Sequence, residues 1–423
     1  MIDIVKKEKG ITLIALVVTI IVLIILAGVS INMLVGDNGI ITQAQKAKEN
    51  METAQIEEQK NLNELYWQID NGLDLGGGSG QNACTNCILI YTKEQLIAFR
   101  DRVNGGDTCE GKTIKLMNDI DLNGSESDQW IPMTEFAGTF DGNYHTIKNM
   151  YMDTDKYRYL SMFVDLTETG EVKNLKIENC YIRNTYCELF YDQEIGYDSY
   201  NNGASAICRY NYGNISNIWI TGNIIGYIPT ITDSPDKARI RTHVTGIALV
   251  NYNCIKNCIN EADLEGESQS PNSNCTVGAY ASGICNGNIG LISNCYNTGN
   301  LKANGYNVAI VGGICATSGE ATASQEVNCY NIGNITGNCV MNSARNGGII
   351  GLSVENVDTI VNCHYLDTIS TTVSYTGAKI QTESTMKSEA FIENLGYAYQ
   401  KDENNINNGY PILAWQRDLA MNN

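Results

Sequence analysis

The feature that most constrains the fold is an asparagine that returns in the same local context along the chain. It closes the segments TIKN, EVKN, NISN, CIKN, LISN, EVN and TIVN, at Asn149, Asn174, Asn217, Asn257, Asn294, Asn328 and Asn362. The last three intervals between these asparagines are 37, 34 and 34 residues. Periods of this length are typical of solenoid repeats.

A second motif lies between these asparagines and completes the repeating unit. The segments SAICRY, TGIALV, SGICNG, GGICAT and GGIIGL mark an apolar strand centred on Gly-Ile or its equivalent. A turn, a second strand that ends in the asparagine, and a Gly-Asn turn such as NTGNL follow, without any pattern of helix length. These features predict a mainly β chain, a right-handed parallel β-helix over 88–382. We expect residues 383–423 to be a C-terminal cap that covers the last strand edge.

Fifteen cysteines would suggest a disulfide framework in a secreted protein. Seven of them, however, follow the recurring asparagine or the Gly-Ile pair, where other units carry Met, Leu, Ile or Ala. Such a position faces the core, and free Cys behaves there as a small hydrophobe. We therefore predict a core ladder rather than disulfides or metal ligands, with stacked inward asparagines bonded along the coil axis. The ladder consists of Cys208, Cys258, Cys285, Cys295, Cys315, Cys329 and Cys363.

Among the eight other cysteines, three lie before the first recurring asparagine. Cys84 and Cys87 form a CxxC pair in a Gly-rich segment, and Cys109 follows nearby. A single CxxC is a weak indicator of zinc binding or redox activity. A local disulfide, free thiols and a metal site all remain open for these residues.

The N-terminal segment is strongly apolar. Residues 1–10 form a short basic leader, and the run 11–35 has no charged residue and is long enough to span a bilayer. An ordinary signal peptide would end in a cleavage site after this run, but a helical spacing continues to residue 70. We therefore expect a helix over 11–70, apolar and then amphipathic, and a flexible linker over 71–87. The basic leader predicts a single-pass protein of the cytoplasmic membrane, with its N-terminus inside and the β-helix outside.

Composition and motifs exclude several classes of function. The net charge of −19, from 47 acidic and 28 basic residues, argues against nucleic-acid binding. None of the three histidines, His145, His243 and His364, has a partner at metal-ligand spacing, and no cofactor motif occurs. A β-helix can carry a polysaccharide-active site, but no paired-carboxylate motif selects Asp141, Glu168 or Glu178. We expect no enzymatic activity and no cofactor.

Tyrosines crowd residues 181–212, where a longer insertion interrupts the repeat. Tyrosine among polar neighbours suits recognition of carbohydrate or protein. The alternative is that these tyrosines reflect the usual tyrosine content of β-structure and have no binding role. The candidate ligand surface consists of Tyr181, Tyr186, Tyr191, Tyr197 and Tyr200, with Tyr210 and Tyr212 close behind.

The stretch KKEKGITLIALVVTIIVLIILAG resembles the N-terminus of type IV prepilins and pseudopilins. The resemblance implies cleavage by prepilin peptidase between Gly10 and Ile11, followed by methylation of Ile11. The glutamate that this class carries at the fifth mature position is replaced by Ala15. In the class, that carboxylate pairs with the N-terminal amine of a neighbouring pilin inside an apolar filament core, where an unpaired charge is costly. Ala15 therefore favours a minor, tip or stand-alone role.

Residues 88–416 resemble the GLUG-type surface repeats of bacterial adhesin-like proteins. The resemblance rests on NDIDL, FAGTFDGNYHTIKNM, LSMFVDL, the GI…NCYNTGN units and the ending NNGYPILAWQ. Together the two resemblances predict a membrane-inserted, pilin-like surface protein that displays a β-helix for adhesion to an extracellular glycan or protein, in a surface filament or alone. The alternatives are a pseudopilin-like component of a type II secretion or type IV pilus machine, with other pilins as partners, and a polysaccharide-active enzyme.

Overall fold

The computed structural model describes Lys46 and residues 87–193, 196–271, 274–319, 324–353 and 360–421. The expected leader 1–10, the helix 11–70 apart from Lys46, and the linker 71–87 apart from Cys87 lie outside the described residues. The same holds for Gly10, Ile11, Ala15 and Cys84. Among the described helices, none is long and apolar enough to cross a membrane.

Three sheets carry almost all the described strands, and their pairings are parallel except for β10 with β11. The first, named here the β14 sheet, has seven strands. They are β7 (Tyr159–Leu160), β10 (Phe190–Asp192), β11 (Tyr197–Ser205), β14 (Arg239–Thr245), β19 (Thr276–Ser282), β24 (Val308–Gly312) and β29 (Arg345–Gly347).

The second sheet, named here the β12 sheet, also has seven strands, and each follows a strand of the β14 sheet after a short turn or comes from the first coils. They are β4 (Met133–Phe136), β8 (Phe163–Leu166), β12 (Cys208–Asn211), β15 (Ala248–Asn251), β20 (Cys285–Asn288), β25 (Cys315–Ser318) and β30 (Ile350–Ser353).

The third sheet, named here the wide sheet, has nineteen strands because most coils cross it in two or three short segments, although β9 and β13 each cross it as one long strand. They are β1 (Cys87–Ile90), β2 (Thr113–Leu116), β3 (Ile120–Asp121), β5 (Thr139–Lys148), β6 (Tyr151–Thr154), β9 (Glu171–Asn184), β13 (Asn214–Ile228), β16 (Cys254–Lys256), β17 (Ile259–Asn260), β18 (Asp263–Ser268), β21 (Leu291–Ser293), β22 (Tyr296–Asn297), β23 (Leu301–Gly305), β26 (Gln325–Val327), β27 (Tyr330–Asn331), β28 (Ile335–Cys339), β31 (Ile360–Val361), β32 (Cys363–Leu366) and β33 (Ala378–Gln381).

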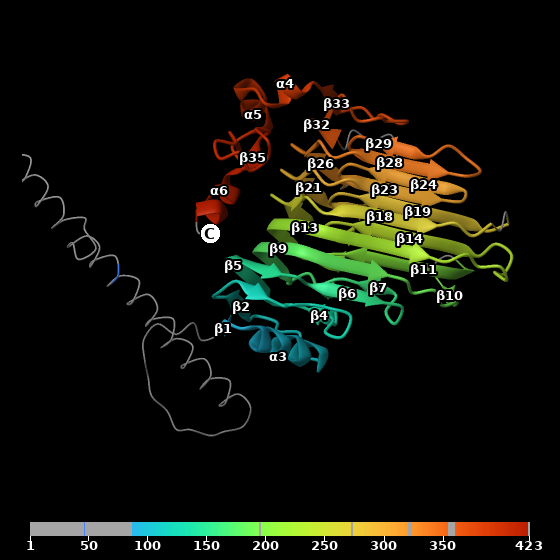
Figure 1. Cartoon of the computed structure of the whole chain (residues 1–423), viewed down its shortest axis with the longest axis horizontal. Helices are drawn as coiled ribbons and strands as arrows, with labels where there is room; N and C mark the ends of the chain where they lie inside the picture. Colours follow the sequence, from blue (N-terminus) through green and yellow to red (C-terminus); the bar gives the residue numbers. More distant parts are fainter. Residues whose placement is uncertain are drawn as a thin grey trace, which may run out of the picture. The chain divides into compact units, whose positions relative to one another are not determined.

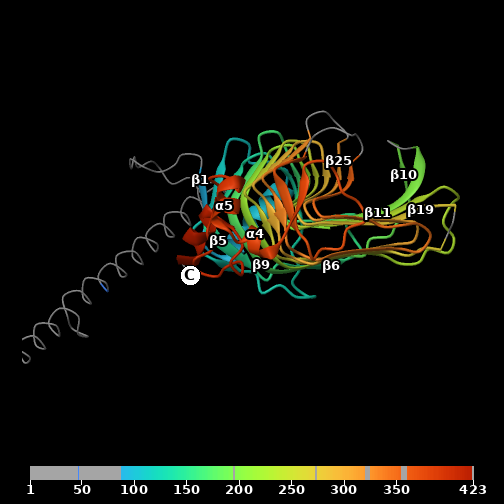
Figure 2. The same cartoon turned by 90° about the horizontal axis from the view of Figure 1, so that it is seen from above.

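One coil runs from the β14 sheet through the β12 sheet to the wide sheet, and the next coil repeats this path (Figure 1). Successive coils lie nearly on top of one another when viewed from above (Figure 2). The expectation of a mainly β chain with parallel sheets is confirmed, and the arrangement is consistent with a β-helix-like fold.

The repeated Gly-Ile pair forms the turn from the β14 sheet to the β12 sheet. Gly283 lies between β19 and β20, and a Cβ atom placed on it would be 2.4 Å from the carbonyl oxygen of Gly313 in the next coil. The following Ile284 is fully buried. Glycine is therefore required because the backbones of stacked coils approach too closely for a side chain, while the isoleucine fills the core behind the turn.

The recurring asparagine bends each strand of the wide sheet. Asn217, Asn257, Asn294, Asn328 and Asn362 all have a left-handed backbone, with φ between 52° and 55°. Asparagine tolerates this conformation better than other residues with a Cβ atom. Each side chain is half-buried rather than in the core, and its Nδ2 donates to the Oδ1 of the asparagine one coil earlier. The donor–acceptor distances are 2.8 Å from Asn217 to Asn174, 3.1 Å from Asn257 to Asn217, 3.1 Å from Asn294 to Asn257, 3.3 Å from Asn328 to Asn294 and 2.9 Å from Asn362 to Asn328.

Because the bend reverses the direction of the side chains, the residue after each asparagine points into the core. Four of the seven repeat cysteines follow these asparagines and the other three follow the Gly-Ile turn or its equivalent, and all seven are fully buried free thiols. Strand pairing aligns them with other apolar residues, as Cys208 with Phe163 and Ala248, and Cys315 with Ile350. The core members are Cys208, Cys258, Cys285, Cys295, Cys315, Cys329 and Cys363.

Helix α3 (Lys93–Asn104) lies at the N-terminal end of the coil stack (Figure 1). Thr92 caps it by accepting a hydrogen bond from the Gln95 backbone N–H. The Phe99 ring lies 6.1 Å from that of Phe136 and 6.0 Å from that of Phe140. The helix thus covers the apolar end of the first coils.

The C-terminal segment, expected to be a cap on the last coil, lies along the outer side of the wide sheet. Tyr296 and Tyr330 stack there at 4.8 Å, and their hydroxyls donate to Gln416 Oε1, at 2.8 Å, and to the Pro411 carbonyl oxygen. Trp415 donates to the carbonyl oxygen of Asn257 at 3.1 Å. The elements are α4 (Glu383–Met386), α5 (Glu389–Leu395), β34 (Tyr399–Gln400), β35 (Ile412–Leu413) and α6 (Ala414–Met421).

A second column of polar side chains lies inside the coils and ends on a carboxyl group. Asn211 donates to Asn251 at 2.8 Å, Asn251 to Asn288 at 2.9 Å, and Asn288 to Glu326 Oε1 at 2.7 Å. Ser318 also donates to this oxygen, at 2.8 Å, whereas Oε2 of Glu326 has no hydrogen-bond partner. Burial raises the pKa of Glu326 to about 7.

Glu326→Gln should stabilise the fold above neutral pH. The pKa of Glu326 is about 7 in the folded state against 4.5 unfolded, so stability is lost as pH rises from about 4.5 to 7. We expect a gain of up to about 3 kcal/mol in unfolding free energy at pH 8 and almost none at pH 4, measured by denaturant titration. The exposed control Glu135→Gln should change neither value, and an equal effect at both pH values would contradict the prediction.

Two substitutions of Asn294 separate the contribution of its left-handed backbone from that of its side-chain hydrogen bonds to the asparagines of neighbouring coils. Both Asn294→Gly and Asn294→Ala remove the hydrogen bonds with Asn257 and Asn328, but only alanine is strained at a φ of 53°. We expect a loss of about 1–2 kcal/mol for glycine and about 1 kcal/mol more for alanine, measured by chemical denaturation. At Asn304, a strand position without positive φ, the glycine variant should instead be less stable than the alanine variant. Equal stability of the two Asn294 variants would refute this account.

Candidate ligand-binding surface

The structure does not bring the five predicted surface tyrosines together. Tyr181 lies in β9 of the wide sheet and stacks on Tyr151 at 5.0 Å. Tyr200 packs in a small apolar cluster beside Val277. Tyr191 and Tyr197, 63% and 46% exposed, lie on the antiparallel β10–β11 hairpin. Tyr186 lies in the turn before that hairpin, with its hydroxyl 3.4 Å from Glu188. The insertion is thus a hairpin that projects from the coils (Figure 2).

A different group of tyrosines does form one surface, on the outer side of the β12 sheet. The rings of Tyr212 and Tyr252 stack at 4.5 Å with an interplanar angle of 12°, and the Tyr210 ring meets Tyr252 edge-on at 5.9 Å. Tyr212 and Tyr252 each remain 39% exposed. We name Tyr210, Tyr212 and Tyr252 the tyrosine platform. The tyrosine platform therefore presents a flat aromatic area to solvent.

An ion pair borders the tyrosine platform. Arg209 donates from Nε to Asp165 Oδ1 at 2.8 Å and from Nη2 to Oδ2, so the pair is bidentate. The guanidinium carbon of Arg209 lies 4.3 Å from the ring centre of Tyr210 and 5.1 Å from that of Tyr159. Since Tyr159 belongs to β7, Arg209 connects the tyrosine platform to the β14 sheet.

Alternate residues of β14 point outward beside this junction. Arg239, Arg241 and His243 share that side of the strand. His243 stacks on Tyr280 at 4.6 Å, and its Nδ1 lies 3.0 Å from Oδ1 of Asn286 in β20. This hydrogen bond links the β14 and β12 sheets. Burial, helped by the nearby Arg241 charge, lowers the pKa of His243 to about 4. The ring is therefore neutral at pH 7.

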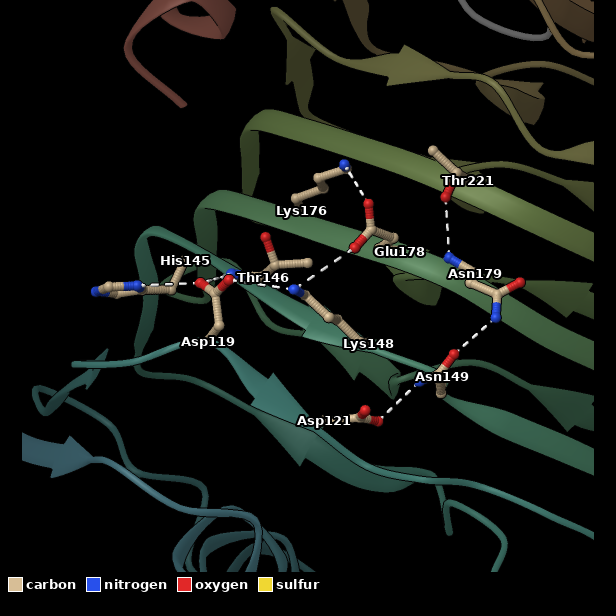
Figure 3. A network of polar contacts seen from close by, with 10 residues as sticks. All are labelled: Asp119, Asp121, His145, Thr146, Lys148, Asn149, Lys176, Glu178, Asn179 and Thr221. Carbon is tan, nitrogen blue, oxygen red and sulfur yellow. Dashed lines mark hydrogen bonds and ion pairs between the residues drawn. The ribbon is translucent and has the colours of Figure 1, made fainter. Parts of the chain in front are cut away.

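His145, by contrast, belongs to a polar network on the wide sheet (Figure 3). Its Nδ1 lies 3.2 Å from Asp119 Oδ1, and Lys148 lies 3.5 Å from Asp119 Oδ2. Lys176 pairs with Glu178 at 2.6 Å. Lys148 of β5 thus meets Asp119 on one side and Glu178 of β9 on the other, and Asp121 accepts a hydrogen bond from Asn149 at 2.8 Å, so the network joins neighbouring coils.

The remaining candidate residues lie apart from one another. Asp141 accepts hydrogen bonds from Asn143 and Asn174, and Glu168 is exposed beyond β8. His364 lies 2.9 Å from the Asn362 side chain. Over the residues with described placement, no group of three or more His, Cys, Asp or Glu side chains is arranged to hold a metal ion.

Of the three candidate residues Cys84, Cys87 and Cys109, the last two lie within the described residues. Cys87 is disulfide-bonded. Cys109 is a buried free thiol, and burial raises its pKa to about 11. Cys109 therefore does not share the bond of Cys87.

Sequence reasoning pointed to Tyr210 and Tyr212 but missed Tyr252, His243 and Asn286. Tyr252 follows Asn251 as Tyr212 follows Asn211, and these asparagines are paired between β12 and β15. A repeat alignment that compared outward positions as well as core positions would have found Tyr252. The contact between His243 and Asn286 joins residues from different sheets of successive coils, and no local pattern indicates it.

The fold resembles that of a solved crystal structure from Bacteroides ovatus, of a protein proposed to be an immunoglobulin A1 protease. The TM-score is 0.51 at 20% sequence identity, and the match covers 80% of this chain and 95% of the other. No family model matches the sequence, and no curated protein matches it. At this level of identity the similarity concerns the fold alone.

Proposed function

We propose that this chain is a non-enzymatic, pilin-like bacterial surface protein that presents a right-handed parallel β-helix outside the cell for adhesion to a glycan. In this proposal residues 11–70 form a helix whose apolar first part anchors the protein in the cytoplasmic membrane and whose second part is amphipathic. The observation that carries the binding role is the tyrosine platform, Tyr210, Tyr212 and Tyr252.

The chemistry of the tyrosine platform favours a sugar ligand. The apolar face of a sugar ring packs on an aromatic ring, while its hydroxyl groups need polar partners at the edge. Tyr212 and Tyr252 offer the flat apolar area, and Arg209 and Asp165 supply charged groups beside it. Because the rings already support one another, binding requires little ordering of side chains.

Replacing two rings of the tyrosine platform should abolish most glycan binding. For the full-length chain in detergent, we expect Tyr212→Ala with Tyr252→Ala to weaken binding to its preferred oligosaccharide by about tenfold or more on a glycan array and by calorimetry. The physical reason is that each lost aromatic contact removes about 1 kcal/mol.

The control is Tyr151→Ala with Tyr181→Ala, which removes a stacked pair of similar geometry from the wide sheet. This variant should bind like the unmodified chain. The proposal is wrong if the unmodified chain binds no glycan, or if the control pair is affected as strongly as the platform pair.

We also propose that prepilin peptidase cleaves between Gly10 and Ile11 and that Ala15 suits a minor or tip position. Mass spectrometry of the protein from native membranes should then find N-methylated Ile11 as the first residue. Gly10→Phe should leave the leader attached, because a bulky residue replaces the small one at the cleavage site, whereas Gly36→Ala should not. A mature protein that begins at Met1 would contradict this proposal.

A further inference from the structure

Arginine is distributed unevenly in this acidic protein. The chain has nine arginines and a net charge of −19. Five of the nine lie on the outer side of the β14 sheet or at its junction with the β12 sheet. The register places Gly203, His243, Tyr280, Ile310 and Arg345 in one outward column across this sheet. The five arginines are Arg158, Arg209, Arg239, Arg241 and Arg345.

Three of these arginines lie near His243, and the charge of the Asp192 carboxylate also acts on one of them, Arg239. The charges of Arg158, Arg239 and Arg241 all act on the His243 ring. Within the described part of the chain, none of the three forms an ion pair, although many other cations do, such as Lys302 with Glu265 at 2.6 Å. Burial, followed by the repulsion of Arg241, lowers the pKa of Arg239. We name Arg158, Arg239 and Arg241 the arginine cluster.

The arginine cluster also contains buried donors that lack acceptors. The Nε atoms of Arg158 and Arg241 are buried without a hydrogen-bond partner, and so is Nδ2 of Asn286. Asn286 is only 5% exposed, and its Oδ1 already bonds His243. Buried donors without acceptors are rare in folded proteins because each costs about 1–3 kcal/mol. An anionic ligand would satisfy these donors and neutralise the three charges.

His243 supplies an acceptor in the same place. Since Asn286 Oδ1 can only accept, the neutral His243 ring carries its proton on Nδ1. Its Nε2 atom therefore keeps a lone pair that can accept a hydrogen bond from a hydroxyl group. A ligand that combines a carboxylate with hydroxyl groups matches this set of donors and one acceptor.

The arginine cluster and the tyrosine platform belong to one continuous row of contacts. The guanidinium carbons of Arg158 and Arg209 each lie 5.1 Å from the ring centre of Tyr159. Arg209 in turn lies 4.3 Å from Tyr210 of the platform. A single oligosaccharide could therefore place one ring on the tyrosine platform and a charged unit at the arginine cluster.

We infer that the ligand is an acidic oligosaccharide whose carboxylate is held by Arg158, Arg239, Arg241 and Asn286, a specificity that rests on the proposed glycan-binding role. A carboxylate fits because its two oxygens can take paired hydrogen bonds from Nε and Nη of one guanidinium. In a chain with net charge −19, this cluster is also where an anion avoids the general repulsion.

The test compares a hyaluronan hexasaccharide with the same oligosaccharide after reduction of its carboxylates to alcohols, using the full-length chain in detergent. We expect the acidic form to bind at least tenfold more tightly, with an advantage that shrinks as salt rises from about 50 to 500 mM. Arg239→Gln with Arg241→Gln should remove the advantage and leave binding of the reduced form unchanged. The control Arg183→Gln changes an arginine that pairs with Asp153 on the wide sheet and should have no effect.

Each result has a distinct meaning. Equal binding of the acidic and reduced forms would overturn the inference and leave the proposed glycan-binding role intact, whereas absence of binding to either would overturn both. Equal or tighter binding of a sulfated hexasaccharide or of hexaglutamate would overturn the assignment of a carboxylated sugar. A thermal midpoint of the double variant at or above that of the unmodified chain would show that the fold is retained, as expected when repelling charges are removed.

Discussion

Hydrogen bonds between asparagine side chains of successive coils set the register on which the other described features depend. Parallel strand pairing by itself does not prevent neighbouring strands from slipping by two residues. Asn257, Asn294 and Asn328 oppose such a slip because each must meet its neighbour while holding a left-handed backbone. That backbone also turns the next residue inward. The buried positions of Cys258, Cys295 and Cys329 therefore follow from the asparagine before them.

Close stacking of similar coils restricts which residues the interior can hold. The turns that contain Gly283 and Gly313 admit no Cβ atom, and the core beside them is filled by isoleucine and cysteine. The inner column of Asn211, Asn251 and Asn288 satisfies its polar groups only by passing hydrogen bonds from coil to coil. Glu326 ends this column with one oxygen lacking a partner, so its ionised form is disfavoured. Within the column each asparagine side chain therefore has a partner in the next coil, whereas the group at the end of the column is left with an unpaired oxygen.

The candidate ligand-binding residues lie where the chain turns from the β14 sheet to the β12 sheet. Residues of β14 and β20 approach one another at this junction, so His243 reaches Asn286 and Arg209 reaches Tyr159. Elsewhere on the molecule most described cations are paired, as in the network of Asp119, Lys148 and Glu178. The arginine cluster places three cations, which form no ion pair among the described residues, near one neutral histidine, an arrangement that adds repulsion rather than stability.

The sequence by itself determined the repeat, the parallel mainly β fold and the core positions of the repeat cysteines, whereas the recurring asparagines, expected inside, lie half-buried. These features are periodic, and a period is visible because the same residue types return at the same spacing, as for Asn294, Asn328 and Cys329. The left-handed asparagine backbone and the path of residues 383–421 along the wide sheet were not predicted, since both depend on packing between distant segments. The candidate site was predicted only in part. Local crowding pointed to tyrosines around the insertion, but only the tertiary structure decided which of them meet. Tyr252, Arg241 and Asn286 come together because stacked coils align their outward side chains across two sheets, and that alignment depends on coil length and turn geometry rather than on any local pattern.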